Sequence, residues 1–235
     1  MYFFQGGYSL YLCFTLPALL LGFWAQARVR SAFAKYSRIR NGAGISGMEV
    51  AQRMLMNAGI SDVSVEQTRG MLSDHYDPSK RVLRLSPEIY GGNSIAAAGV
   101  AAHEAGHAIQ HAEGSLMLQV RSAMVPSVQI GSWLGPIIFI IGLLLQSSFG
   151  DNVALVGLGL FGLTALFAVI TLPVEIGASR KAKAWLATSG VICEQERPGI
   201  NRVLDAAALT YVAAAIQAIS TLLYYAFLLF GRRRD

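Results

Sequence analysis

The segment His103-Glu104-Ala105-Gly106-His107 holds two histidines four residues apart, with a glutamate directly after the first. On an α-helix, residues four apart are separated by only about 40° around the axis, so both imidazoles can bind one tetrahedral Zn²⁺. Glu104 is poorly placed to bind the same ion. It can instead accept a proton from zinc-bound water, whose pKa the metal lowers toward ~7, and return it to a leaving amine. The spacing therefore predicts a hydrolytic zinc site.

The residues around this motif predict the helix that the site needs. Asn93-Ser94 precedes an Ala-rich run over residues 95–112, which has high helix propensity, and Gly114 is a stop signal. The flanking positions Val100, Ala101, Ala108 and Ile109 are uncharged, as expected on a low-dielectric helix face. A short motif can also arise by chance, but its helical and apolar setting favours a buried metal site.

A catalytic zinc requires a third protein ligand. Metzincins supply a histidine six residues after the second ligand, following a glycine, but here those positions hold Glu113 and Gln110, which excludes that class. His111 continues the series of histidines four apart. To bind the same ion it would have to reach both along the helix axis and around it. We therefore favour a role as an ordinary polar helix residue or as a hydrogen-bond donor to one of the metal ligands.

Glu175 is the best-placed acid for the third ligand. It follows Pro173, where we expect an apolar helix to end and a polar helix to begin, and an unpaired carboxylate beside an apolar stretch is costly. The alternative is an ordinary acid in the first turn of a helix, stabilised by the helix dipole. Spacing alone leaves both interpretations open.

The composition predicts a membrane protein. Of the 235 residues, 54% are apolar and only 14% are charged. Four stretches approach the ~20 apolar residues that a bilayer-spanning helix needs, and none contains Lys, Arg, Asp or Glu. The charged remainder is too small to enclose four such helices in a soluble core. The stretches are Ser9–Gln26, Ser127–Gln146, Val153–Leu172 and Ala206–Phe230.

The charges around the first stretch predict its orientation. Ala25-Gln26-Ala27 resembles a signal-peptidase site. However, a signal peptide carries positive charge before its apolar region, and Met1–Tyr8 carries none. Five basic residues instead follow the stretch, between Arg28 and Arg40. We therefore predict an uncleaved anchor with its N-terminus outside and a cytoplasmic module after it. The base-free loop Ser147–Asn152 should then lie outside. Four spans would also place Arg232–Arg234 outside, whereas the positive-inside rule assigns clustered basic residues to the cytoplasmic side.

The net charge of +5 is a membrane feature, because many basic residues flank apolar stretches and anionic headgroups attract them. No nucleic-acid partner is expected. With only Cys13 and Cys193, a disulfide framework is excluded.

Between the first two spans, residues 27–126 should form a small module. Ser46-Gly47-Met48-Glu49 has capping-box spacing and predicts a helix ending before Gly59. Alternation in Val63–Glu66 and Arg81–Leu85 predicts two or three antiparallel strands. His75 and Tyr76, just before the predicted turn, are candidates for stabilising an oxyanion. A plain edge-strand role for both is the simpler alternative.

Several runs across nearly the whole chain carry a family resemblance: Phe33–Ser37 with Arg40-Asn41, Gly47–Ala51, Asp74–Pro78, Leu83–Ser86, Ala101–His111, and Leu172–Glu175 with Ala178–Arg180. They resemble the YugP-like neutral zinc metallopeptidases of bacterial membranes, which are similar to gluzincins such as the HtpX-like peptidases. In those proteins a glutamate on a later helix completes the site. The resemblance thus implies that Glu175 is the third ligand of one zinc ion per chain, in a multi-pass protein of the cell membrane.

The chain departs from these relatives after that glutamate. The family pattern has an Asp two residues later, where this chain has Gly177, and HtpX-like proteins have an Asp four residues later, where this chain has Ser179. Ser179 is therefore a candidate for the outer partner of a ligand, as are His75, Tyr76 and His111.

The sequence thus predicts a mainly α-helical integral membrane protein with about four transmembrane helices and a small α+β gluzincin-like zinc peptidase module. Its expected parts are span 9–26, module 27–126, transmembrane hairpin 127–172, glutamate helix and loop 173–200, and span 206–230.

The predicted activity is that of a membrane-embedded metalloendopeptidase. Its substrates should be peptides or membrane-protein segments bound along a strand edge. The alternative is a zinc-binding structural or regulatory membrane protein without hydrolysis, which would need His103 and His107 but not Glu104. A channel or transporter is disfavoured, because the spans contain no acids or bases.

Overall fold

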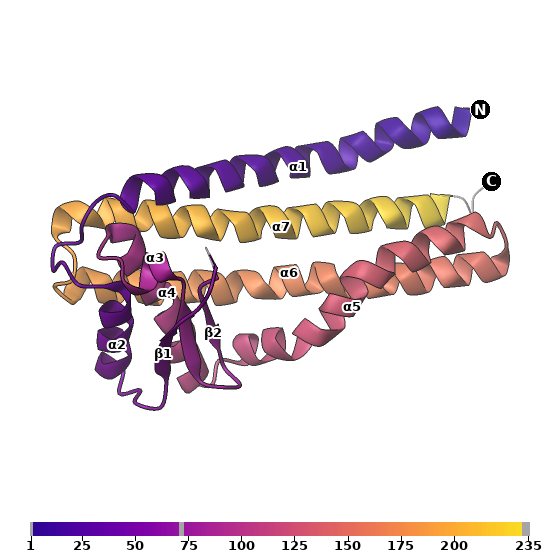
Figure 1. Ribbon diagram of the computed structural model, residues 1–235. Coiled ribbons are helices and arrows are strands. Elements are labelled where there is room, and N and C mark those ends of the chain that lie inside the picture. The colour runs from indigo at the N-terminus through magenta and orange to yellow at the C-terminus, as the bar shows by residue number, and fades with distance from the viewer. Residues whose placement is uncertain (1, 71–72, 232–235) are drawn as a thin grey trace. The chain divides into compact units, whose positions relative to one another are not determined.

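The computed structural model describes residues 2–70 and 73–231 of the chain (Figure 1). Arg232–Arg234 lie outside the described residues. The structure therefore does not test their predicted position on the outer side. The elements are α1 (Tyr2–Tyr36), α2 (Gly47–Asn57), β1 (Ser64–Gln67), β2 (His75–Asp77), β3 (Val82–Leu85), α3 (Pro87–Tyr90), α4 (Ile95–Ala112), α5 (Leu116–Leu144), α6 (Ser148–Thr188), the 3-10 helix η1 (Glu194–Glu196) and α7 (Arg197–Gly231).

The chain forms two compact units. The helical unit comprises Met1–Trp24, Val120–Leu172 and Tyr211–Asp235, and the mixed unit, which contains the sheet, comprises Ala25–Gln119 and Pro173–Thr210. Each is described by itself.

Four helices are long and apolar enough to cross a membrane, by length and composition: Leu12–Tyr36, Leu116–Leu144, Ser148–Thr188 and Glu194–Gly231. The prediction of four such helices is confirmed. Their side chains leave large apolar surfaces uncovered, with Phe23 66%, Trp133 70% and Leu144 74% exposed. Apolar area of this extent is unfavourable in water and is the surface that lipid tails cover.

In the helical unit, α5 and α6 pack at backbone distance through glycines. A Cβ added at Gly142 would lie 2.2 Å from the backbone nitrogen of Ala154, and one at Gly157 would lie 2.3 Å from that of Phe139. Small residues that allow such close approach are typical of helix pairs in membranes. Phe139, Ala154 and Leu158 form a small core with Leu229 of α7.

In the mixed unit, α2 is capped as predicted. The Ser46 hydroxyl accepts a hydrogen bond from the Glu49 amide at 3.3 Å, and the Ser46 amide donates to the Glu49 carboxylate at 2.7 Å. This capping box satisfies two N-terminal amides that the helix itself cannot pair. The apolar face of α2 then packs against α4, with Val50 and Met54 almost fully buried.

The sheet has strand order β1-β3-β2. β2 pairs antiparallel with β3, but β1 pairs with β3 in parallel, so the prediction of an all-antiparallel sheet is wrong for β1. The connection after β1 passes the C-terminal end of β3, where Thr68 donates to the Leu85 carbonyl and Asp74 accepts from the Ser86 amide. The chain therefore crosses from one side of β3 to the other before β2 begins. β2 starts at the same end of the sheet at which β1 stops, so β1 runs parallel to β3 and β2 runs antiparallel to it.

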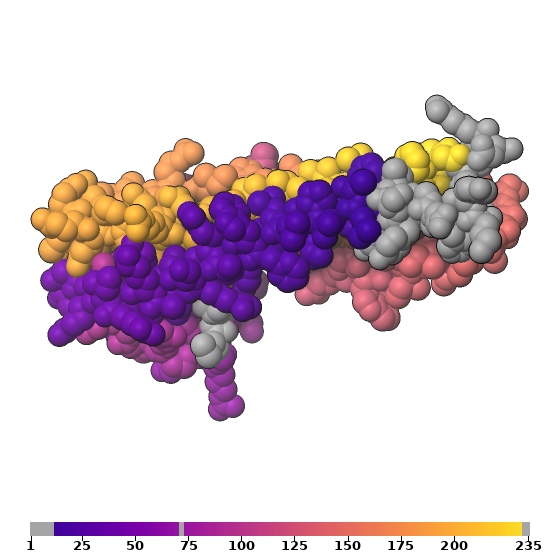
Figure 2. All heavy atoms as spheres, turned by 90° about the horizontal axis from the view of Figure 1, so that it is seen from above, coloured from indigo at the N-terminus to yellow at the C-terminus, as the bar shows by residue number. Residues whose placement is uncertain are grey.

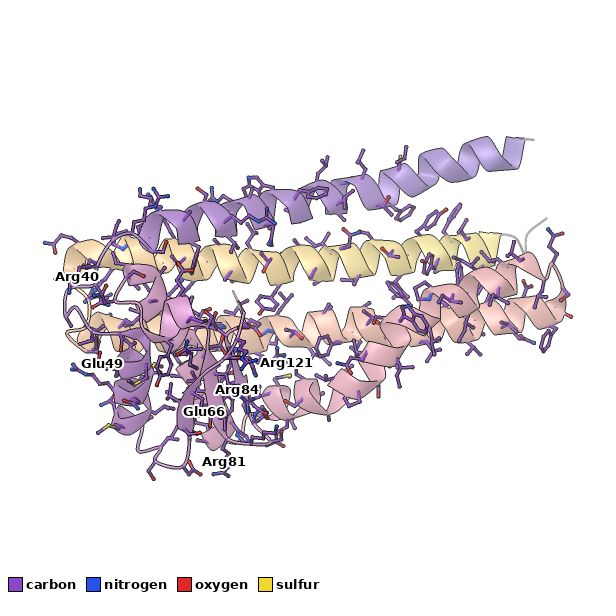
Figure 3. The ribbon with its side chains drawn as sticks, viewed as in Figure 1. Arg40, Glu49, Glu66, Arg81, Arg84 and Arg121 are labelled. Carbon is purple, nitrogen blue, oxygen red and sulfur yellow. The ribbon has the colours of Figure 1, made fainter. Side chains whose placement is uncertain are left out.

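Opposite charges bridge all three strands. Arg84 of β3 lies 3.8 Å from the Glu66 carboxylate on β1 and 3.2 Å from the Asp77 carboxylate on β2 (Figure 3, which labels Arg84 and Glu66). Such cross-strand pairs reinforce a short sheet modestly.

The motif helix α4 has the bounds that the sequence predicted. The Ser94 hydroxyl accepts from the Ala97 amide at 3.1 Å, and Gly114, with a φ of +70°, follows its C-terminal end. Most of α4 is buried, because it packs against α2 on one side and α6 on another.

The expected helix break at Pro173 is absent, because α6 runs continuously from Ser148 to Thr188. A proline removes a single backbone hydrogen bond, and packing can hold the helix through that loss. Beyond Pro173, the residues Val174, Ala178, Ala182 and Leu186 recur every fourth position and are 0–2% exposed. This buried stripe keeps α6 helical.

Candidate metal centre

Three predicted ligands meet where α4 packs against α6 in the mixed unit. The Nε2 atoms of His103 and His107 lie 3.2 and 3.6 Å from the Oε2 atom of Glu175. One ligand atom from each of the three residues lies within 4.8 Å of the others. The two imidazole rings stand nearly perpendicular, at 86°, and the three residues are 9%, 6% and 1% exposed. A single ion between them would be sheltered from bulk water.

The second nitrogen of each imidazole has its own partner. His103 Nδ1 lies 3.0 Å from the Ser179 hydroxyl, and His107 Nδ1 lies 3.0 Å from Gln110 Oε1. The Gln110 amide donates to the Val174 carbonyl at 2.8 Å, so its oxygen is left to accept from His107 Nδ1–H. That tautomer directs the lone pair of Nε2 toward Glu175. Fixing the outer nitrogen in this way is typical of metal-binding histidines.

The sequence did not lead us to predict Gln110 as the partner of His107. Its position three residues after His107, on the same face of a helix, was the available signal. The neighbouring helix makes room for it: a Cβ at Gly177 would lie 2.6 Å from Gln110 Nε2. Gly177 therefore accommodates the amide that holds His107.

Glu175 lies in the middle of α6 rather than in a first turn. The alternative interpretation of this acid as a helix-terminal residue stabilised by the dipole therefore fails, since no helix begins near it. Ser179 follows four residues later on the same face of α6, so one helix contributes both the carboxylate and the partner of His103.

The two helices can meet this closely because the motif contains a glycine. A Cβ at Gly106 would lie 2.7 Å from the Ala178 carbonyl oxygen. Any side chain at this position would push α6 away from α4. Gly106 thus sets the distance between the histidines and Glu175.

Glu104 is 9% exposed and belongs to the same helix as the two histidines. On helical geometry it lies about 100° around the axis from His103 and about 60° from His107. It is therefore beside the ligand face but not on it, as a proton acceptor next to a bound metal must be.

The remaining candidates lie at the sheet. The Tyr76 hydroxyl and His111 Nδ1 are 2.8 Å apart, which joins β2 to the last turn of α4. Burial raises the pKa of Tyr76, with a smaller contribution from Asp77, so its hydroxyl stays protonated at neutral pH. His75 is exposed, and its ring nitrogens lie 2.8 Å from the Ser73 carbonyl and 3.4 Å from the Arg84 guanidinium. These contacts tie His75 to the sheet rather than to the three-residue cluster.

The acids that could have competed with Glu175 are engaged elsewhere. Glu113 accepts from the Lys181 ammonium at 2.6 Å, and Glu194 pairs with Arg197 at 2.9 Å. Glu196 accepts from the backbone amides of Gly42 and Cys193.

The residues fit a zinc ion by their donor chemistry. Two imidazole nitrogens and one carboxylate oxygen are a ligand set of catalytic zinc sites, whereas structural sites use four protein ligands. Within residues 2–70 and 73–231, His103, His107 and Glu175 are the one group of three or more metal-binding side chains close enough to hold an ion.

Comparisons with known proteins independently point to zinc. A family model described as "Putative neutral zinc metallopeptidase" matches residues 11–230. A protein of Bacillus subtilis (strain 168) named "Putative membrane protease YugP" is 45% identical over 228 residues, which cover 96% of this chain and 99% of that protein. No solved structure matches the chain.

Helices of membrane-spanning length and a buried His-His-Glu cluster fit a zinc peptidase of the membrane. The chain belongs to the neutral zinc metallopeptidase family whose model covers nearly all of it.

Proposed function

We propose that this protein is a membrane-embedded zinc metalloendopeptidase of the gluzincin type, with His103, His107 and Glu175 as the ligands of one zinc ion. The convergence of the three ligand atoms within 4.8 Å carries the proposal. The hydrogen bonds to His103 Nδ1 and His107 Nδ1 support it, because they leave both Nε2 atoms available for a metal.

A zinc ion held there would supply a Lewis acid for the scissile carbonyl and would lower the pKa of an attacking water toward ~7. Glu104 then accepts a proton from that water as its oxygen bonds to the carbonyl carbon. When the C–N bond breaks, Glu104 returns the proton to the leaving amine, and the second proton of the water stays on the new carboxylic acid. At neutral pH that proton passes to the amine, so the products are a carboxylate and an ammonium. Ser179 and Gln110 act only through the imidazoles, which they hold in orientation.

The edge strand β2 supports peptides as the substrate class. Tyr76 connects this strand to the last turn of α4, so β2 is tied to the helix that carries Glu104. Among the described residues β2 pairs with β3 along one side only, and an extended peptide can add to the other side through backbone hydrogen bonds. Backbone recognition of this kind suits peptides and segments of membrane proteins.

The variant Glu104→Gln tests the hydrolytic role. The amide has nearly the same shape as the carboxylate but cannot accept the proton, so we expect turnover to fall by at least ~10²-fold to 10⁴-fold while zinc stays bound. Metal content of the detergent-purified protein and cleavage of a quenched fluorescent peptide library measure the two roles separately. Cleavage at the wild-type rate would refute the mechanism. Full zinc content with no cleavage in the wild type would instead favour a structural or regulatory zinc protein.

We also propose that the mixed unit faces the cytoplasm. Five basic residues between Arg28 and Arg40 follow the first span, and the loop between α5 and α6 carries none. A phosphatase reporter, active only outside, should be inactive when fused at Gly114 and active at Gly150. A cytoplasmic reporter at the same two positions is the matched control. The reverse pattern at both positions would overturn the assignment.

A further inference from the structure

A cavity in the mixed unit is lined by none of the metal-binding residues. It has a volume of about 310 Å³ and is formed by α1 and α7, which lie side by side in Figures 1 and 2. Every charged group that lines it is a cation. The lining residues are Arg28, Ser31, Ala32, Lys35 and Tyr36 of α1, with Arg202 and Ala206 of α7.

The spacing of these residues presents them on one face of each helix. Arg28, Ser31 or Ala32, and Lys35 follow one another at intervals of three or four residues, as do Arg202 and Ala206. Residues at this spacing are neighbours on a helix surface. The cavity therefore gathers cations that are dispersed in the sequence.

Tyr36 contacts two of the cations that line the cavity, Lys35 and Arg202. Its hydroxyl accepts a hydrogen bond from the Arg202 guanidinium at 3.3 Å, and the Lys35 ammonium lies 5.4 Å from the centre of its ring. The tyrosine is only 7% exposed, and a Cβ at Gly199 would lie 2.8 Å from its ring. A glycine on α7 thus lets the ring pack closely and keeps Lys35 and Arg202 near one another.

Asp205 on α7 and Glu194 on η1 pair with cations other than Lys35 and Arg202. Asp205, between the two lining residues of α7, pairs with Lys183, and Glu194 pairs with Arg197. In the described part of the chain, neither Lys35 nor Arg202 forms a salt bridge with a carboxylate. Clustered cations repel one another, so an anion in the cavity would be favoured.

The cavity also lies at the border of two apolar stretches, where one ends on α1 and another begins on α7. On α1 the residues from Leu12 to Ala27 carry no charge, and Arg28 is the first cation after them. On α7 the residues from Ala206 to Gly231 carry no charge. Both helices therefore change from charged to apolar at the cavity, which is the composition expected at the level of lipid headgroups.

We propose that this cavity binds a phosphate group, carried by an anionic phospholipid of the surrounding membrane or free in solution. Guanidinium, ammonium and hydroxyl groups together are donors suited to phosphate oxygens. The position at the start of two apolar stretches favours the lipid as the source. The inference goes beyond the proposed peptidase activity and does not depend on it.

Native mass spectrometry of the full chain, released from nanodiscs with equal amounts of phosphatidylglycerol and phosphatidylcholine, tests the proposal. We expect the wild type to retain phosphatidylglycerol preferentially. The double variant Lys35→Gln with Arg202→Gln should lose that preference by on the order of tenfold or more, since each basic residue near a membrane surface contributes to anionic-lipid binding. The double variant Arg30→Gln with Arg38→Gln removes the same charge outside the cavity and should keep the preference.

Because Arg202 also contacts Tyr36, the variant Ser31→Glu provides a second probe. Ser31 is exposed, so a glutamate there adds a negative charge to the cavity without disturbing the packing, and it should abolish the preference as well. Inorganic phosphate is added as a competitor in parallel. Displacement of the bound lipid would assign the cavity to free phosphate, and resistance would assign it to the lipid. Equal retention of both lipids by the wild type with no phosphate bound in the competition arm, or equal losses in the two double variants, would overturn the proposal.

Discussion

The contact between α4 and α6 and the exposed edge of the sheet both carry residues that the sequence marked as candidates, but they hold them in different ways. At the helix contact, His103, His107 and Glu175 are nearly buried and each imidazole has a partner on both nitrogens. At the sheet edge, His75 is exposed and its ring contacts only the Ser73 carbonyl, just before β2, and Arg84 of β3 among the described residues.

The difference reflects what each region has to do. Metal ligands need fixed positions, and the close approach of α4 and α6 at Gly106 provides them. An edge strand offers backbone donors and acceptors, for which side-chain position matters less. We therefore expect substitutions at the helix contact to change metal binding, and substitutions at the sheet to change stability without changing metal content.

The largest effect is expected for Glu175→Gln. The amide keeps the shape of the side chain but is a poor zinc ligand, so only two protein ligands remain. Zinc affinity should fall by more than the roughly 10–100-fold typical of losing an outer partner. Competition of the purified protein against a zinc chelator measures this affinity.

The matched control for Glu175→Gln is Glu113→Gln, which removes the same charge from the salt bridge with Lys181. Glu194→Gln and Glu196→Gln serve as further controls outside the cluster. These three variants should keep wild-type zinc affinity. If Glu175→Gln kept full zinc and activity while one of the three lost both, the ligand set would have to be redrawn.

A smaller effect is expected for Gln110→Ala. This change removes the acceptor for His107 Nδ1–H and the hydrogen bond to the Val174 carbonyl. His107 then loses its orientation while all three ligands remain, so zinc affinity should fall by about 10–100-fold.

Gln119→Ala is the control for Gln110→Ala, because that glutamine donates only to the Gly114 carbonyl at an exposed site. Gln110→Glu separates the two contacts of the amide. It retains an acceptor for His107 but cannot donate to Val174, so it should keep more zinc than Gln110→Ala. Equal affinities for Gln110→Ala and the wild type would show that His107 does not need this partner.

The sequence predicted the parts of this molecule that depend on local patterns. The bounds of α4, the capping box at Ser46 and the four apolar helices follow from spacing and composition over short windows. Glu175, in contrast, became the preferred third ligand only through the family resemblance, because 68 residues separate it from His107 and spacing cannot bring them together.

The failures arise where tertiary packing overrides a local signal. Pro173 predicted a helix end, yet the buried stripe beyond it on α6 keeps the helix continuous. The alternation in β1 predicted a strand but not its direction, since that depends on how the connection to β2 crosses the sheet. Gln110 was missed because its second partner, the Val174 carbonyl, lies on another helix.

The smallest effect is expected at the sheet, for Asp77→Asn. Hydrogen bonds from the Ser79 hydroxyl, and further ones from the Lys80 amide and Arg84, lower the pKa of Asp77 to about 2. The ionised form therefore stabilises the folded state. Since Asp77 lies at a partly exposed turn, its loss should cost on the order of 1 kcal/mol at neutral pH.

This contribution has a defined dependence on pH. A carboxylate whose pKa is depressed in the folded state stabilises it fully above the unfolded pKa of ~4 and loses that stabilisation as pH falls toward the folded pKa. The difference in unfolding free energy between wild type and Asp77→Asn should thus be constant above about pH 5 and shrink between about pH 4 and pH 2. Unfolding of the metal-free protein in detergent measures this difference without a contribution from zinc release. Zinc affinity at neutral pH should be unchanged in Asp77→Asn, and a loss comparable to that of Gln110→Ala would mean that the sheet helps to position the ligands.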